Sequence, residues 1–199
     1  MQRRSCQESP QEAEDYTKKK TIDYIERSED ARAEYEQEIA DIPMSRRIYI
    51  DESGVSRFCY REYARALRGK RVHGLVPGRK FARVNVVAGY CDGRVLGEYC
   101  YTGSTTAKIF EDWFCDFLLP ETHPGDAVIL DNASFHNKKR LRLYASVYKV
   151  TVIFLPPYSP DYNPIEHVWA NMKRFLRNTK QEFRLIQSAI YWYFAMGIL

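Results

Sequence analysis

The sequence predicts one domain of the α/β class, built from a mixed β-sheet that is flanked by helices. Short apolar runs typical of strands alternate with segments of helical periodicity, and two of the early strands form a hairpin. The length of 199 residues is close to that of one ordinary domain, which argues against two full domains. Apolar residues make up 45% of the chain, which is enough to build a core.

Composition excludes several other classes of protein. The charged share of 28% is ordinary, so the chain is not a disordered tail, and no run approaches the roughly 18 consecutive apolar residues of a membrane-spanning helix. The first 20 residues lack the apolar core of a secretory signal. Five scattered cysteines lack the usual spacing of a zinc finger or ribbon. We therefore expect free thiols in a reducing cytoplasm and no membrane partner.

Charge is distributed unevenly along the chain. Residues 1–45 contain 7 basic and 12 acidic residues, a balance of −5, whereas residues 46–199 contain 23 and 14, a balance of +9. A basic surface attracts polyanions, above all nucleic acid, although a merely soluble and mildly basic domain would show the same balance. We expect a polar, acidic lead-in over residues 1–45, with a helix over 22–42 that ends before Pro43, and one working domain over residues 46–199.

The first half of the working domain is predicted to consist mostly of strands. Residues 46–50 form a short buried strand that runs into a turn at 51–54. A basic loop follows within residues 61–83. Residues 82–90 and 94–101 form a hairpin, because the Asp-Gly pair between these two apolar runs is a strong turn signal.

The second half alternates helices and strands. A helix is expected to begin near Ser104, and strands at 128–130 and 150–155 enclose a basic helix at 137–149. The first of these helices has one apolar face, made by Phe110, Trp113, Phe114, Phe117 and Leu118.

A proline-rich loop at residues 156–163 precedes another helix. Asn163 is expected to be its N-cap and Pro164 its first residue, and a last helix follows over 182–196. The buried stripe of the helix after the loop is predicted to contain Ile165, Val168, Trp169, Met172 and Leu176.

Three carboxylates are the candidates for chemistry. Asp51 and Asp131 each follow an apolar run typical of a central strand, and Glu166 lies in the first turn of a helix, where the helix dipole favours an ionised carboxylate. If the two strands are parallel neighbours, both aspartates emerge at the edge where ligand sites of open α/β sheets form. Ionised oxygen ligands suit Mg²⁺ or Mn²⁺, and an ion pair about 3.5–4 Å apart can promote phosphodiester chemistry. An aspartate after a strand is also a common turn residue, so spacing alone leaves both interpretations open.

Three segments resemble signature motifs of the mariner superfamily of DDE transposases, in its bacterial insertion-sequence branch. They are residues 48–54 (IYIDESG), 128–136 (VILDNASFH) and 155–169 (LPPYSPDYNPIEHVW). The third motif is the most specific, because a run of fifteen residues is hard to match by chance. Between Asp131 and Glu166 lie 34 residues, the spacing that this branch typically shows. The resemblance covers roughly residues 30–195.

The resemblance implies a fold and a set of site residues. The catalytic domain of this family has an RNase H-like fold, like that of retroviral integrases, with a mixed five-stranded sheet and helices on both faces. Its first Asp lies on the first strand, its second Asp after the fourth strand, and its Glu on a later helix. By motif, these are Asp51, Asp131 and Glu166. They would be the catalytic residues and the ligands of two Mg²⁺ ions, for which Mn²⁺ can substitute.

The resemblance also implies an activity on DNA. Water attacks a phosphodiester at the element end, and the released 3′-OH then attacks target DNA at a TA dinucleotide, in cut-and-paste movement by a homodimer. Family members begin with helix-turn-helix domains that recognise the inverted repeats, and residues 1–45 do not supply one. We therefore expect a catalytic half at the nucleoid of a prokaryotic cytoplasm: a truncated copy, a fragment, or the product of a second reading frame.

Two alternatives to this activity stay open. One is a stand-alone RNase H-like nuclease without strand transfer, and the other is a catalytically silent DNA-binding remnant of a truncated transposase. Two basic residues, Lys173 and Arg177, share one helix face with Glu166 and are predicted to contact DNA. The alternative for this basic pair is that it only solvates the helix and interacts favourably with the C-terminal end of its dipole.

Overall fold

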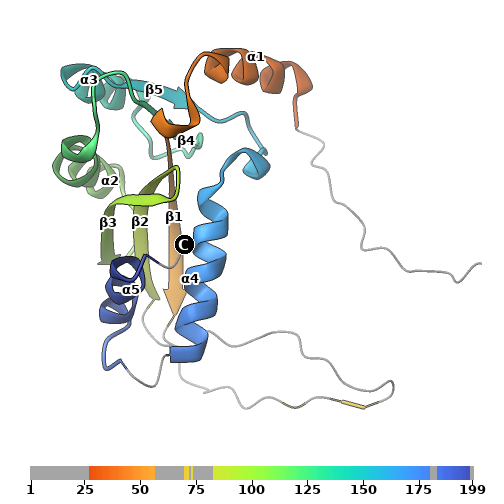
Figure 1. Ribbon diagram of the computed structural model, residues 1–199, viewed down its shortest axis with the longest axis vertical. Coiled ribbons are helices and arrows are strands. Elements are labelled where there is room, and N and C mark those ends of the chain that lie inside the picture. The colour runs from red at the N-terminus through yellow and green to blue at the C-terminus, as the bar shows by residue number, and fades with distance from the viewer. Residues whose placement is uncertain (1–26, 57–69, 72, 74–82, 180–182, 198–199) are drawn as a thin grey trace, which may run out of the picture.

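A five-stranded mixed sheet forms the centre of the computed structural model (Figure 1). The structure describes residues 27–56, 70, 71, 73, 83–179 and 183–197. In spatial order the strands are β3 (Arg94–Thr102), β2 (Arg83–Cys91), β1 (Arg47–Ser56), β4 (Ala127–Leu130) and β5 (Thr151–Phe154). Because β1 pairs antiparallel with β2 and parallel with β4, the mixed sheet expected from the sequence is confirmed.

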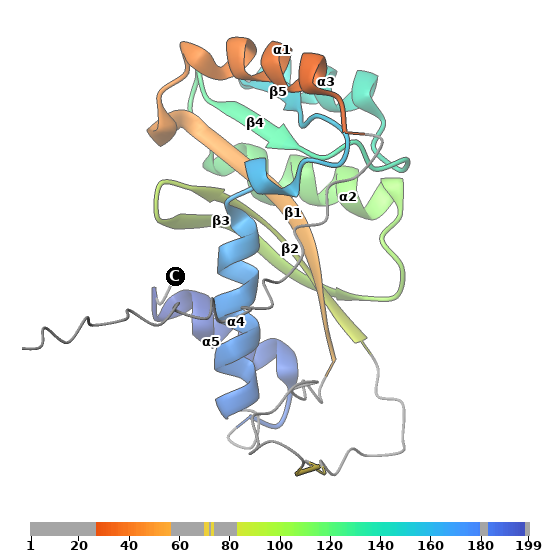
Figure 2. The same cartoon turned by 90° about the vertical axis from the view of Figure 1, so that its right-hand side faces the viewer.

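Helices cover both faces of this sheet (Figure 2). In the described part of the chain they are α1 (Glu29–Ala40), α2 (Ala107–Trp113), α3 (Lys138–Val147), α4 (Ile165–Thr179) and α5 (Ile186–Ala195). Shorter helical turns are η1 (Met44–Arg46), η2 (Phe114–Leu118), η3 (Leu119–Glu121) and η4 (Pro160–Tyr162). The helices α2 and α3 pack on one face, and α1, α4 and α5 pack on the other. Within the described ranges, no helix is long and apolar enough to cross a membrane.

The alternation of β1 decides which side chains face which layer. Successive residues of a strand point to opposite faces of the sheet. Ile48 and Ile50 accordingly pack against the layer of α2 and α3, whereas Tyr49 and Val55 pack on the side of α1 and α4. By the same alternation, the side chain of Asp51 points toward α4.

The turn predicted at residues 51–54 is wrong. The strand β1 continues through these residues to Ser56, because β2 pairs with it from Tyr49 to Ser56. Ser53 and Val55 are buried in this extension. A strand pairing between segments distant in sequence has here overridden the turn preference of Asp, Ser and Gly.

The predicted hairpin is confirmed as β2 and β3. Its two-residue turn consists of Asp92 and Gly93, with φ of 44° and 81°. Positive φ at both central residues is the geometry of a type I′ turn, for which Asp-Gly is a preferred sequence.

The helix predicted from Ser104 begins at Ala107, and Thr106 is its N-cap. Four of the five residues of its predicted apolar face are buried, but Phe117 is 43% exposed. The reason is the π-helical turn η2, whose wider winding rotates Phe117 out of phase with the other four. Phe117 instead packs against Tyr99 of β3, with 4.8 Å between the ring centroids.

The start of α4 is attached to β1 by a side chain. Asn163 Nδ2 donates a hydrogen bond of 3.3 Å to the carbonyl of Ile50. The helix begins at Ile165, one residue later than predicted, and Asn163 does not cap it with its side chain, because Asn163 Oδ1 is buried and has no hydrogen-bond partner among the described residues. The predicted buried stripe of α4 is confirmed at all five positions: Ile165, Val168, Trp169, Met172 and Leu176.

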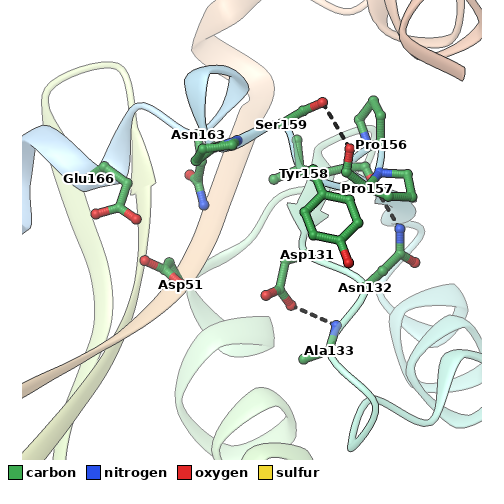
Figure 3. Close-up of a pocket in the computed structure, with 12 residues that line it drawn as sticks. Asp51, Asp131, Asn132, Ala133, Pro156, Pro157, Tyr158, Ser159, Asn163 and Glu166 are labelled. Atoms are coloured by element: carbon green, nitrogen blue, oxygen red, sulfur yellow. Dashed lines mark hydrogen bonds between the residues drawn. The ribbon is translucent and has the colours of Figure 1, made fainter. Parts of the chain in front are cut away.

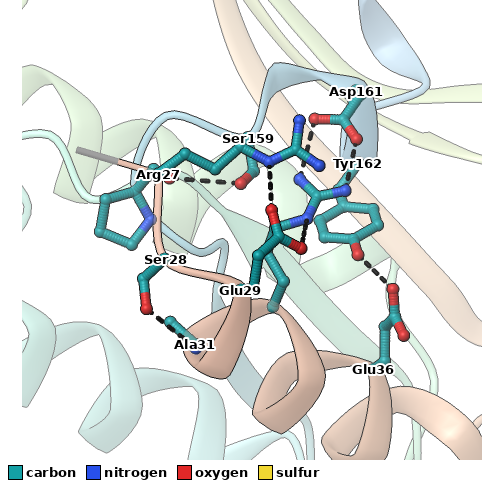
Figure 4. Close-up of polar contacts among 10 residues, drawn as sticks. Arg27, Ser28, Glu29, Ala31, Glu36, Ser159, Asp161 and Tyr162 are labelled. Carbon is teal, nitrogen blue, oxygen red and sulfur yellow. Dashed lines mark hydrogen bonds and ion pairs between the residues drawn. The ribbon is translucent and has the colours of Figure 1, made fainter. Parts of the chain in front are cut away.

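The helix α1 packs on the body of the domain (Figure 4). Tyr35 is buried in a cluster with Tyr49 of β1. The guanidinium of Arg32 pairs with Asp161 and lies 4.0 Å from the ring centroid of Tyr162, so α1 also holds the end of the proline-rich loop.

The remaining predicted elements agree with the structure where it describes them. The helix predicted at 137–149 is α3, the strands at 128–130 and 150–155 are β4 and β5, and the last helix is α5. The described cysteines Cys91, Cys100 and Cys115 are free. Almost all of the predicted basic loop at residues 61–83, and all of residues 1–26, lie outside the described residues.

Candidate active site

Two neighbouring parallel strands bring Asp51 and Asp131 to the same level of the sheet. Tyr49 of β1 is paired with Ile129 of β4, and each aspartate lies two residues further along its own strand direction. Asp131 is the first residue beyond β4, whereas Asp51 lies within β1, beyond the part of that strand that pairs with β4. A cleft at the carboxyl end of parallel strands is the usual ligand site of such sheets.

A cavity of about 440 Å³ opens at this point (Figure 3). Its walls come from β1, from the loop after β4, from the proline-rich loop and from the first turn of α4. The residues that line it are Asp51, Asp131, Asn132, Ala133, Leu155, Pro156, Pro157, Tyr158, Ser159, Pro160, Asn163 and Glu166. The structure thus brings the three predicted carboxylates to one cavity.

The carboxyl group of Asp51 is strongly perturbed by its surroundings. Burial, together with the nearby carboxylate of Glu166, raises the pKa of Asp51 to about 7. The indole of Trp169 opposes this effect by donating a hydrogen bond of 2.9 Å from Nε1 to Asp51 Oδ2. The helix that carries Glu166 therefore also holds Asp51 in place.

Asp131 is perturbed in the opposite direction. A hydrogen bond from His136 lowers the pKa of Asp131 below its ordinary value, with help from the backbone N–H of Ala133. Oδ1 of Asp131 lies 3.1 Å from His136 Nε2 and 3.0 Å from the Ala133 nitrogen. Two carboxyl groups at one cavity thus have different proton affinities because their surroundings differ.

These donors suit a divalent cation. The described residues contain no group of three or more His, Cys, Asp or Glu side chains arranged to hold a metal ion as they stand. Mg²⁺, however, is typically held by one or two carboxylates together with water and substrate phosphates, so an open set of carboxylates fits its chemistry. The neighbouring carboxylates Glu166 and Asp131 both contribute to the raised pKa of Asp51, and a cation would relieve that repulsion.

Comparison with known proteins identifies the family. Residues 46–188 match the family model of the DDE superfamily endonucleases. The chain belongs to this family. The sheet and its helices are similar to those of the Mos1 transposase structures, which confirms the RNase H-like fold implied by the resemblance.

Several proteins are similar to this chain over part of their length. The chain in the crystal structure of the Mos1 Strand Transfer Complex is 17% identical, with a TM-score of 0.66, over 90% of this chain and 59% of that one. The mariner Mos1 paired end complex with Mg gives 16% identity and a TM-score of 0.65, over 92% and 60%. An uncharacterized protein, y4pE/y4sA of Sinorhizobium fredii (strain NBRC 101917 / NGR234), is 29% identical over 102 residues, 51% of this chain and 64% of its own length. This DDE endonuclease therefore spans less than two thirds of each of these relatives.

The sequence did not single out Glu52. It follows Asp51 in β1 and so points to the opposite face of the sheet, where burial raises its pKa to about 8. Its Oε1 is buried and has no hydrogen-bond partner among the described residues. Strand alternation would have placed Glu52 correctly if the extension of β1 had been recognised.

Two further contacts of the candidate site were also missed. Trp169 was assigned to the buried stripe of α4, and it is buried there, but its indole N–H additionally bonds Asp51. His136 is the last residue of the motif at 128–136, but no role was predicted for it. In the structure it bonds Asp131. Both side chains carry a ring N–H, which is the signal that could have marked them as partners of a carboxylate.

The two basic residues predicted to contact DNA lie further along α4. Lys173 and Arg177 are half-buried, and Arg177 Nε has no hydrogen-bond partner in the described part of the chain. Their contact with DNA stays a prediction.

Proposed function

We propose that this DDE endonuclease is the catalytic part of a transposase of the mariner superfamily, in the bacterial insertion-sequence branch. In the first step, water attacks a phosphodiester at the element end, and the 3′-oxygen leaves as a 3′-OH. In the second step, that 3′-OH attacks a phosphodiester of target DNA at a TA dinucleotide. A new P–O bond joins the element to the target, and the 3′-oxygen of the cut target strand leaves as a 3′-OH.

In this proposal, Asp51, Asp131 and Glu166 hold the divalent ions. When bound, Mg²⁺ or Mn²⁺ would neutralise charge on the attacked phosphate and make a bound water more acidic. The residues themselves orient the ions, and their supporting hydrogen bonds from Trp169 and His136 keep the carboxylates in place.

One observation carries the proposal. Three carboxylates from three separate segments of the chain line one cavity, and the charges of Glu166 and Asp131 both raise the pKa of Asp51. Groups of like charge at one cavity are unfavourable without a cation, so their convergence favours a metal site over a set of ordinary turn residues.

DNA is the proposed partner of this site. The Mos1 structures similar to this chain are a strand transfer complex and paired-end complexes, including ones with Mg and with Mn. The balance of +9 over residues 46–199 supports a polyanionic ligand as well. The active form is proposed to be a homodimer.

A joining assay tests the proposal. A fluorescent duplex with a free 3′-OH is incubated with supercoiled plasmid and Mg²⁺, and plasmid topology and attached fluorescence are followed together. Transfer of the label to the plasmid is the expected result. Nicked plasmid without label would instead indicate a stand-alone nuclease, and intact plasmid without label a catalytically silent DNA-binding remnant.

A substitution at the site tests whether its carboxylates are needed for the reaction followed in this assay. Asp131→Ala is expected to abolish both cleavage and joining while leaving the fold intact. Asp112→Asn is the matched control, because Asp112 lies on α2, half-exposed, in a surface ion pair with Lys108. Activity retained in Asp131→Ala would remove Asp131 from the site and contradict the proposed role of the carboxylates.

A further inference from the structure

Each of the two aspartates at the cavity is held from one side by a ring N–H. Trp169 Nε1 bonds Oδ2 of Asp51 at 2.9 Å, and His136 Nε2 lies 3.1 Å from Oδ1 of Asp131. The backbone N–H of Ala133 reaches that same Oδ1. Among the described residues, no side-chain hydrogen bond reaches the other oxygen of either carboxylate. A ring N–H therefore holds one oxygen of each aspartate, and the backbone N–H of Glu52 also interacts with the carboxylate of Asp51.

Trp169 is fixed in position by its packing. Only 1% of it is exposed, and its ring packs edge-on against Phe194 of α5, with 6.4 Å between centroids. It lies one helical turn after Glu166 on α4, so one rigid helix delivers both a carboxylate and the indole that restrains Asp51.

His136 is held just as firmly on the other side of the cavity. Its side chain is 1% exposed and lies against the rings of Phe110 and Phe135, whose centroids are 4.2 and 4.3 Å away. Its Nδ1 is buried and has no hydrogen-bond partner among the described residues. The ring thus has one polar contact, which is directed at Asp131.

We propose that Trp169 and His136 are positioning residues, each of which restrains one carboxylate oxygen so that the second is aimed at a divalent cation. The inference rests on the proposed function, because it takes Asp51 and Asp131 to be metal ligands. Groups that hydrogen-bond a metal ligand fix its orientation, and their loss typically weakens metal affinity by about 10- to 100-fold. Neither ring would contact the metal or the DNA in this role.

Trp169→Phe tests the role of the indole. The variant keeps an aromatic ring in the stripe and removes the N–H, so Mn²⁺ affinity of the DNA-free protein, measured by electron paramagnetic resonance, is expected to fall by about 10-fold. Trp113→Phe is the matched control. Trp113 is also 1% exposed, and its Nε1 donates to the carbonyl of Gly97, which does not line the cavity. This control should lower the melting temperature comparably and leave Mn²⁺ affinity unchanged.

His136 allows a test by rescue. His136→Phe keeps the aromatic packing and removes the donor, so Mn²⁺ affinity should fall by about 10-fold. His136→Gln places an amide N–H at a similar reach and should restore most of the affinity. Equal Mn²⁺ affinity in wild type, Trp169→Phe and His136→Phe would overturn the inference, as would a loss in His136→Gln as large as in His136→Phe.

Asp131→Ala separates failure of this inference from failure of the proposed function. If Asp131→Ala loses Mn²⁺ binding while the ring variants bind normally, the metal site stands and the positioning role is wrong. If Asp131→Ala binds Mn²⁺ like wild type, the proposed metal site itself is wrong, and the positioning role falls with it.

Discussion

Arg32 reaches Asp161 across 129 residues of sequence, and its two terminal nitrogens lie 3.1 and 2.7 Å from the two carboxylate oxygens. The guanidinium holds the pKa of Asp161 below its usual range. The pair ties α1 to η4, at the end of the proline-rich loop that forms one wall of the cavity. A helix outside the stretch that matches the family model, residues 46–188, thus supports the candidate site.

Arg32→Ala should lower the free energy of unfolding by about 1–2 kcal/mol, because it removes two charged hydrogen bonds and the contact with Tyr162. Arg32→Lys keeps the charge without the two-pronged geometry, so an intermediate loss is expected. Because the folded pKa of Asp161 is depressed, this stability is present above the unfolded value of about 3.9 and is lost as the pH falls below it. Urea denaturation at pH 7 and pH 3 measures both effects, and an Arg32→Ala protein as stable as wild type at pH 7 would contradict them.

The stability of the metal-free protein should depend on Asp51 and Glu52. Burial raises their pKa values to about 7 and about 8, whereas both groups titrate near pH 4 in an unfolded chain. Between these values the folded state binds more protons than the unfolded state. The free energy of unfolding should therefore fall as the pH rises from about 5 to about 8.

Urea denaturation in the presence of a chelator, at several pH values, measures that slope. Asp51→Asn and Glu52→Gln should each flatten it, since an amide does not titrate. Added Mg²⁺ should stabilise the wild type more at pH 8 than at pH 5, because metals bind the ionised carboxylate. The same slope in wild type and in both variants would show that neither carboxyl group has a displaced pKa.

Substitutions at Lys173 and Arg177 test whether this face of α4 contacts DNA. Replacing either residue with Ala should weaken binding to duplex DNA and reduce the salt dependence by roughly one ion, while Mn²⁺ affinity barely changes. Arg174→Ala removes the same charge from a neighbouring exposed position that bonds Asn171, and it should have a smaller effect. If the double variant binds DNA with unchanged affinity and salt slope, both residues only solvate the helix.

Features with a local cause could be predicted from the sequence. The β2–β3 hairpin follows from Asp92 and Gly93, whose backbone adopts the positive φ that the turn requires. The stripe of α4 follows from a repeat of apolar residues that is visible within fifteen positions. Asp131 directly after β4 and Glu166 in the first turn of α4 were predictable for the same reason.

Features that depend on distant contacts could not be predicted. The extension of β1 past Asp51 arises from pairing with β2, and the bond from Trp169 to Asp51 spans 118 residues. The apolar periodicity of the helix correctly predicted that Trp169 is buried, but the direction of its N–H depends on how α4 packs on β1. Phe117 was placed wrongly because a π-helical turn breaks the 3.6-residue period on which the prediction relied.

The most direct test of the metal site is a crystal structure of this chain grown with Mn²⁺, in which anomalous scattering locates the ions. The account predicts a peak in the cavity, about 2.1 Å from carboxylate oxygens of Asp51 and of at least one of Asp131 and Glu166. Trp169 and His136 should remain bonded to Asp51 Oδ2 and Asp131 Oδ1. A cavity without an anomalous peak at saturating Mn²⁺, or ions bound only elsewhere on the chain, would contradict the central claim.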